Sequence, residues 1–246
     1  MTYIPNPKTA GSGIICCIPQ TGTCPNNCKD CFFQSGRSYL EPLDKNLPNT
    51  PSEEQAEGRI VRVNDGNDSS VDPATVIMAT QRFRHKFYNT AINSTGLARF
   101  PGPVVLTVNP GEMTDRDIYR ANISKNLMMV RVRTNTWNMN VVDKAIDYYT
   151  LRDNPVPVIL TFMAYHEHQP LMSNDDYMFR KRTMNSYWAI TSKAWKTIME
   201  YYGDNHLVYS CGKEGETGAT GCRFCGNCLR EYFATMERMR EGVVKP

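Results

Sequence analysis

Short apolar segments bounded by turn-forming residues alternate along this chain with segments of helical periodicity. Buried strands are predicted at residues 13–18, 104–108, 127–132, 156–163 and 207–210, and the fourth is so apolar that both of its faces should be covered. Alternation of this kind is typical of right-handed β-α-β units that build a parallel sheet. We therefore predict an α/β fold, a partial (β/α) barrel of about five or six parallel strands with a small cysteine-rich extension at the C-terminal end.

Helices are predicted between these strands. Asp72 followed by Pro73 is a typical helix start, and Val76, Phe83 and Phe87 would then share one helical face. Thr114 with Asp117 would cap a short helix, and residues 140–151 predict another. The inner stripes predicted for the two later helices are Trp188, Trp195, Ile198 and Tyr202, and then Leu229, Phe233 and Met236.

The chain divides into two predicted parts. Residues 1–210 would form the partial barrel, and residues 211–246 a C-terminal segment with four cysteines and a helix. Residues 34–72 are rich in Pro, Asn, Asp, Ser and Gly apart from a short strand-like run at 59–63, which predicts a long ordered loop or lid. Ligands bind at the carboxyl ends of the strands in such sheets, so residues that follow a strand are the candidates for function.

Composition narrows the class of protein. The chain has 246 residues, 41% of them hydrophobic, which is enough for one substantial core. No apolar stretch is long enough for a membrane span, and the first residues lack a signal sequence, so we expect a cytoplasmic protein without a membrane partner. The net charge of +3 does not indicate a nucleic-acid partner, although one stays possible.

The nine cysteines are clustered rather than scattered. Disulfides are disfavoured in the reducing compartment expected for this chain, so metal binding or catalysis is the better explanation. Two of the cysteines lie inside the first predicted strand, where we expect at least one to be simply buried. The clusters are Cys16 and Cys17, then Cys24, Cys28 and Cys31, and finally Cys211, Cys222, Cys225 and Cys228.

The second of these clusters has the spacing C-x3-C-x2-C directly after the first strand. Three thiolates can ligate three irons of a [4Fe–4S] cluster and leave the fourth iron open to an exchangeable ligand. Structural zinc normally takes four protein ligands. The loop therefore favours the iron–sulfur cluster, and the alternative is a zinc site completed by Cys16, Cys17 or a distant cysteine.

With this cysteine loop the chain resembles the radical S-adenosylmethionine (SAM) superfamily over roughly residues 11–210. The resemblance implies that Cys24, Cys28 and Cys31 bind the cluster, whose unique iron chelates the amino and carboxylate groups of SAM. One electron, from a donor such as flavodoxin or ferredoxin, would then yield methionine and a 5′-deoxyadenosyl radical that abstracts hydrogen from the substrate. The family often has an aromatic residue before the third cysteine, where this chain has Asp30, so Phe32 or the residue after it is the candidate for the adenine contact.

The segment Asn109-Pro110-Gly111-Glu112 follows the strand at 104–108. It resembles the Gly-Gly-Glu motif at the end of the family's second strand, with Pro110 in place of the first glycine. Glu112 and nearby carbonyl groups could accept hydrogen bonds from the SAM ammonium, and Gly111 would let the backbone approach closely. The alternative is an ordinary turn.

Two more polar segments follow strands. Arg131 and Arg133 could pair with the SAM carboxylate, and Asn135 could bond the ribose hydroxyls. The alternative is an edge strand with solvated arginines. Residues 64–68, Asn-Asp-Gly-Asn-Asp, could bind ribose or a metal, but such a sequence is more often a surface turn.

The last cysteine cluster combines C-x2-C-x2-C with the more distant Cys211. Four thiolates can close a zinc site or a [4Fe–4S] cluster. Zinc ribbons usually use two separate C-x2-C pairs, so the triple spacing favours a second, auxiliary [4Fe–4S] cluster, with structural zinc as the alternative. Because protein would fill all four positions, we expect a role in electron relay or as a scaffold.

Three residues that follow a predicted strand are candidates for substrate recognition. Tyr165, His166 and His168 follow the strand at 156–163 and could bind substrate or move protons, or else belong to a hydrated loop. The basic run at 179–182 could meet phosphate, although an exposed helix start explains it better. We predict a radical SAM enzyme with a small-molecule or nucleotide-like substrate; the alternatives are a peptide- or protein-modifying radical SAM enzyme and a non-catalytic zinc-binding module.

Overall fold

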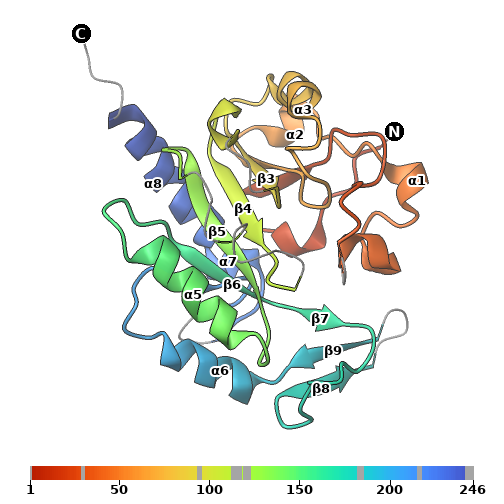
Figure 1. Cartoon of the computed structure of the whole chain (residues 1–246). Coiled ribbons are helices and arrows are strands. Elements are labelled where there is room, and N and C mark those ends of the chain that lie inside the picture. Colours follow the sequence, from red (N-terminus) through yellow and green to blue (C-terminus); the bar gives the residue numbers. More distant parts are fainter. Residues whose placement is uncertain are drawn as a thin grey trace.

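The main sheet is parallel and curls into a half-barrel (Figure 1). The computed structural model describes residues 2–28, 31–92, 96–111, 118, 123–181, 186–214 and 218–241. The sheet has seven strands in the order β1-β2-β3-β4-β5-β6-β10. Their bounds are β1 Ile14–Cys17, β2 Ile60–Val63, β3 Lys86–Thr90, β4 Val104–Val108, β5 Leu127–Thr134, β6 Val158–Phe162 and β10 Val208–Ser210.

The predicted partial barrel is confirmed, but it has seven strands rather than five or six. The strand-like run at 59–63 is β2, a full member of the sheet. The strand β3 was missed because Phe83 and Phe87 have the spacing of a helical face. Helix α3 (Pro73–Thr80) begins at Asp72 as predicted but ends before Phe83, and Phe87 lies in β3. The shared helical face was therefore wrong.

The outer face of the sheet carries the larger core. It packs against α3, α5 (Met139–Thr150) and α6 (Ser192–Tyr201), through buried residues such as Val76, Ile146 and Trp195. Helix α5 confirms the helix predicted at 140–151. The short helix predicted around Thr114 and Asp117 lies outside the described residues.

The inner face is filled by the C-terminal helix α8 (Asn227–Glu241). Tyr232 is fully buried there, between Leu229 and Met236, which pack against the same cluster. These three residues are spaced i, i+3 and i+7, as one helical face requires. The predicted stripe was wrong about Phe233, which is 61% exposed because it lies on the flank of that face.

The inward-facing residues change from apolar to polar toward the carboxyl ends of the strands. Side chains two residues apart share a face of a strand. On β2 the inward pair is Ile60 and Arg62, and on β5 it is Met129 and Arg131. The inside of the half-barrel is thus apolar toward the amino ends of the strands and polar toward their carboxyl ends. The polar residues of this layer that line a cavity are Arg62, Asn89, Thr107, Arg131 and Arg133.

A small antiparallel sheet, in the order β7-β9-β8, lies in the connection from β6 to α6 (Figure 1). Its strands are β7 Ala164–Tyr165, β8 Tyr177–Arg180 and β9 Tyr187–Ile190. Trp188 pairs with Tyr165 and Phe179 in this sheet, so its prediction as part of a long helix was wrong. Helix α6 begins after Thr191, whose side chain caps it by accepting a hydrogen bond from Ala194 N.

The remaining elements are short. They are η1 Pro7–Thr9, η2 Phe33–Arg37, α1 Leu43–Asn46, α2 Glu53–Ala56, η3 Leu97–Arg99 and α7 Cys222–Cys225. Three of them, with β2, occupy the segment 34–72 that was expected to be a loop or lid.

Within the described parts of the chain, no helix combines the length and apolarity needed to cross a membrane.

Candidate metal and cofactor site

The three cysteines of the C-x3-C-x2-C loop line one cavity of about 250 Å³ at the carboxyl ends of the strands. Cys24, Cys28 and Cys31 share this cavity with polar residues from the ends of β2, β3 and β5. Phe32 lines it too, and its ring stacks with the Lys8 ammonium. Residues 29 and 30 between the last two cysteines are outside the described residues.

Asp68 anchors the cysteine loop. Its carboxylate is 2% exposed and accepts hydrogen bonds from Asn26 Nδ2 at 3.0 Å, Thr90 Oγ1 at 2.7 Å and Ala91 N at 2.7 Å. One side chain therefore joins the loop to the segments after β2 and β3. A second link runs from Asn67 Nδ2 to the Gly22 carbonyl at 2.9 Å.

Residues 64–68 form a wall of this cavity, because they follow β2, the neighbour of β1 in the sheet. A Cβ atom at Gly66 would collide with the Phe33 ring, so only glycine fits there. Asn64 has a left-handed φ of 61°. The sequence alone predicted mainly a surface turn for this segment. The signal that would have found it was the strand-like run directly before it.

The motif expected to bind SAM is elsewhere. Asn109 and Gly111 follow β4, the fourth strand in the sheet order, and line a second cavity of about 240 Å³. Glu112 lies outside the described residues. Arg133 lines both cavities, so the two are neighbours.

Asn135 and Tyr165 also line the second cavity. Asn135 is buried, donates to the Tyr165 hydroxyl at 3.1 Å and accepts from Trp137 N at 3.1 Å. Its amide therefore shapes the turn after β5 and holds Tyr165 in place.

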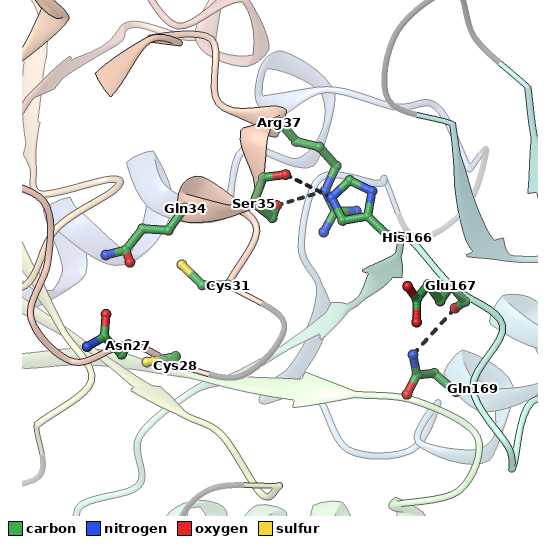
Figure 2. Close-up of a pocket in the computed structure, with 9 residues that line it drawn as sticks. All are labelled: Asn27, Cys28, Cys31, Gln34, Ser35, Arg37, His166, Glu167 and Gln169. Atoms are coloured by element: carbon green, nitrogen blue, oxygen red, sulfur yellow. Dashed lines mark hydrogen bonds between the residues drawn. The ribbon is translucent and has the colours of Figure 1, made fainter. Parts of the chain in front are cut away.

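A third cavity of about 400 Å³ lies on the other side of the cysteine loop and is drawn in Figure 2. Cys28 and Cys31 line it together with His166, whose Nε2 is 3.0 Å from the Ser35 carbonyl oxygen. His168 is not among its lining residues and packs edge-on against Trp188. Of the three residues expected to act on substrate, only His166 therefore lies beside the cysteine loop.

The second cysteine group lies on the inner face of the half-barrel. Cys211 follows β10, Cys222 and Cys225 belong to α7, and Cys228 lies in the first turn of α8. Gly226 allows this arrangement because it ends α7 in the left-handed conformation. Cys211 and Cys228 pack against the inner core.

The four thiols lie near enough for their charges to influence one another. Burial raises the pKa of Cys211, and the other three thiols raise it further, whereas Arg131 lowers it. Burial also raises the pKa of Cys222, which Arg62 lowers. Arg131 Nη2 donates to Cys228 Sγ at 3.4 Å. Two arginine side chains thus approach this group from the cavity above it.

Cys16 and Cys17 are fully buried in β1, as expected for at least one of them. Cys17 lies in the outer core, and burial raises its pKa to about 12. Cys16 Sγ accepts a hydrogen bond from Arg62 Nη2 at 3.2 Å.

Within the described ranges, no three His, Cys, Asp or Glu side chains stand close enough together to hold a metal ion. Both cysteine groups offer thiol donors, which are suitable ligands for iron–sulfur clusters and for zinc. The chemistry of the donors therefore fits the proposed metal sites. Loading either group with metal would require its sulfur atoms to move closer together.

Comparison with described protein families, curated proteins and solved structures finds no match to this chain.

Proposed function

We propose that this protein is a radical SAM enzyme in which Cys24, Cys28 and Cys31 hold a [4Fe–4S] cluster. One observation carries the proposal: three thiols with this spacing line a single cavity at the carboxyl ends of parallel strands. Three ligands leave one iron for an exchangeable partner. When bound, the reduced cluster supplies the electron that cleaves SAM to methionine and a 5′-deoxyadenosyl radical, which abstracts hydrogen from the substrate.

The polar residues of the cavity suit the amino-acid part of SAM. Asn64 Oδ1 is a buried acceptor that has no hydrogen-bond partner among the described residues, and Asn64 lines the cavity. An ammonium group brings three donors, so we assign Asn64 to the SAM ammonium. The sequence suggested this role for Glu112, which lies outside the described residues.

A carboxylate needs a guanidinium partner for a paired hydrogen bond. Arg133 lines the cysteine cavity and also the second cavity. We therefore assign Arg133 to the SAM carboxylate. The second cavity, next to it, is the proposed place for a small-molecule or nucleotide-like substrate.

For the four C-terminal cysteines we propose an auxiliary [4Fe–4S] cluster with zinc as the alternative. Two of the four thiols, Cys211 and Cys228, pack against the inner core, which suits electron relay or a scaffold rather than substrate binding. A flavodoxin- or ferredoxin-type electron donor and a cytoplasmic location belong to the same proposal.

The test is anaerobic purification followed by iron analysis and electron paramagnetic resonance (EPR) of the reduced protein with and without SAM. We expect about four to eight irons per chain and a signal that changes when SAM is added. Cys28→Ala should reduce 5′-deoxyadenosine formation to background. Cys17→Ala, the same change at a core thiol outside the cavity, should retain it. A colourless zinc protein without a reduced-state signal would instead support the non-catalytic module.

A further inference from the structure

Arg131 lies between the two cysteine groups. Its side chain lines the cavity of Cys24, Cys28 and Cys31, while its Nη2 donates to Cys228 Sγ at 3.4 Å. Its Nη1 donates to Asn89 Oδ1 at 3.1 Å. Asn89 in turn donates to the Val63 carbonyl at 2.8 Å, which fixes the guanidinium across the inside of the half-barrel.

The charge of Arg131 has no carboxylate partner. In the described part of the chain it forms no ion pair, and its Nε is buried without a hydrogen-bond partner. Another arginine of this layer differs, because Arg62 pairs with Asp65 at 3.3 Å. Arg131 is half-buried and lines the cavity, so its charge is only partly hydrated and has no carboxylate to offset it. The group that Arg131 does touch is a thiol of the second cysteine site.

Metal loading would supply the missing counter-charge. Four thiolates around Zn²⁺ or an oxidised [4Fe–4S] core carry a net charge of about −2. A guanidinium hydrogen-bonded to one of the sulfurs stabilises that charge, and stabilises a reduced cluster more than an oxidised one.

We propose that Arg131 is the resident counter-charge of the second cysteine site, and that it holds the metal there and raises the reduction potential of a cluster. This rests on the proposed metal site at the four C-terminal cysteines, not on SAM cleavage. It also differs from the SAM-carboxylate role that the sequence suggested for Arg131. Arg131 is a positioning residue, since it acts through the sulfur of Cys228.

The experiment compares Arg131→Met, which removes the charge, with Arg131→Lys, which keeps it. Arg152→Met is the control, because Arg152 is an exposed arginine that contacts the Tyr148 ring. All variants are made in the full chain carrying Cys28→Ala, so that only the second site is loaded. If iron is bound, the potential is measured by EPR-monitored titration; if zinc is bound, its transfer to a coloured chelator is timed.

For an iron–sulfur site we expect Arg131→Met to lower the reduced-to-oxidised ratio at a fixed potential about tenfold, a shift of about 59 mV for one electron. For zinc we expect release about tenfold faster. Arg131→Lys should recover part of either effect, and Arg152→Met should show none. An unchanged potential or release rate in Arg131→Met would overturn the proposal, as would a site that takes up no metal.

The metal-free protein gives a second, independent measurement. Removing a half-buried charge that has no counter-charge should leave the metal-free chain at least as resistant to urea as the parent, although the loaded protein is weakened. Failure of metal-free Arg131→Met to fold would therefore contradict the proposal. SAM cleavage by the chain with an intact Cys28 tests the proposed enzyme activity separately.

Discussion

The two cysteine groups differ in their surroundings, although all seven thiols are half-buried. Cys24, Cys28 and Cys31 lie on a loop without regular structure and line two cavities between them. Cys211 and Cys228 begin or end regular elements and pack against the inner core. Three thiols beside a cavity leave room for an exchangeable ligand, whereas four thiols of which two pack against the inner core are suited to a closed site. The contrast teaches that similar cysteine spacings can stand in different surroundings within one fold.

The two groups are also held differently. The loop depends on a few hydrogen bonds, and the one from Asn26 to Asp68 connects it to Thr90 and Ala91, which donate to the same carboxylate. The interior group depends on apolar packing of α8 against the sheet. Each kind of support can be removed separately.

The largest effect is expected from the support of the interior group. Tyr232→Ala removes a buried ring from the inner core and should lower the free energy of unfolding by about 3–5 kcal/mol. Phe233→Ala, one residue along, should change it by less than about 0.5 kcal/mol because that ring is exposed. Urea denaturation followed by circular dichroism measures both. Equal effects would contradict the placement of α8.

The next effect concerns the loop. Asp68→Asn replaces one of two carboxylate oxygens that each accept from two donors, so we expect a loss of about 3 kcal/mol in unfolding free energy. The loop thiols should also react faster with a thiol reagent. Asp72→Asn makes the same change at the cap of α3, where asparagine serves equally well, and should cost only a few tenths of a kcal/mol. If both variants lose the same amount, Asp68 is not the anchor.

A smaller effect separates the roles of the two groups. Cys225→Ala should lower the stability of the metal-loaded protein by about 2 kcal/mol, because one ligand of the closed site is lost. Some SAM cleavage should persist, measured as 5′-deoxyadenosine by mass spectrometry. Complete loss of the first cluster's absorption in this variant would show that the two sites are not independent.

The smallest effect tests Tyr165. Tyr165→Phe removes the acceptor for Asn135 Nδ2 and should cost about 1 kcal/mol. If Tyr165 only shapes the second cavity, SAM cleavage without substrate should stay within about twofold of the parent. Tyr201→Phe, at a hydroxyl on an exposed residue, is the control and should leave stability unchanged. A large loss of SAM cleavage in Tyr165→Phe would place this hydroxyl in the chemistry.

Predictions from the sequence succeeded where local pattern suffices. The apolar run of β6 and the cap at Asp72 indicate their elements through neighbouring residues alone, and both were confirmed. They failed where one pattern fits two structures. Phe83 and Phe87 suit a helical face as well as a turn followed by a strand, and Trp188 suits a helix stripe as well as β9.

The candidate site was harder to predict from the sequence because it joins segments that are distant along the chain. Residues 64–68 gain their place only because β2 pairs with β1, so they reach the cysteine loop ahead of the segment after β4. Likewise, Arg131 and Cys228 are 97 residues apart in sequence, and nothing local indicates their contact.

By itself, the sequence determined the fold class, most of the elements and the grouping of the cysteines, because periodicity and spacing are properties of residues close along the chain. Only the tertiary structure decided which strand ends meet the cysteine loop, which face of α8 is buried and which arginine reaches the second group of thiols. Inward-facing side chains of different strands come together only when the sheet curls, and that curvature is set by packing across the whole chain.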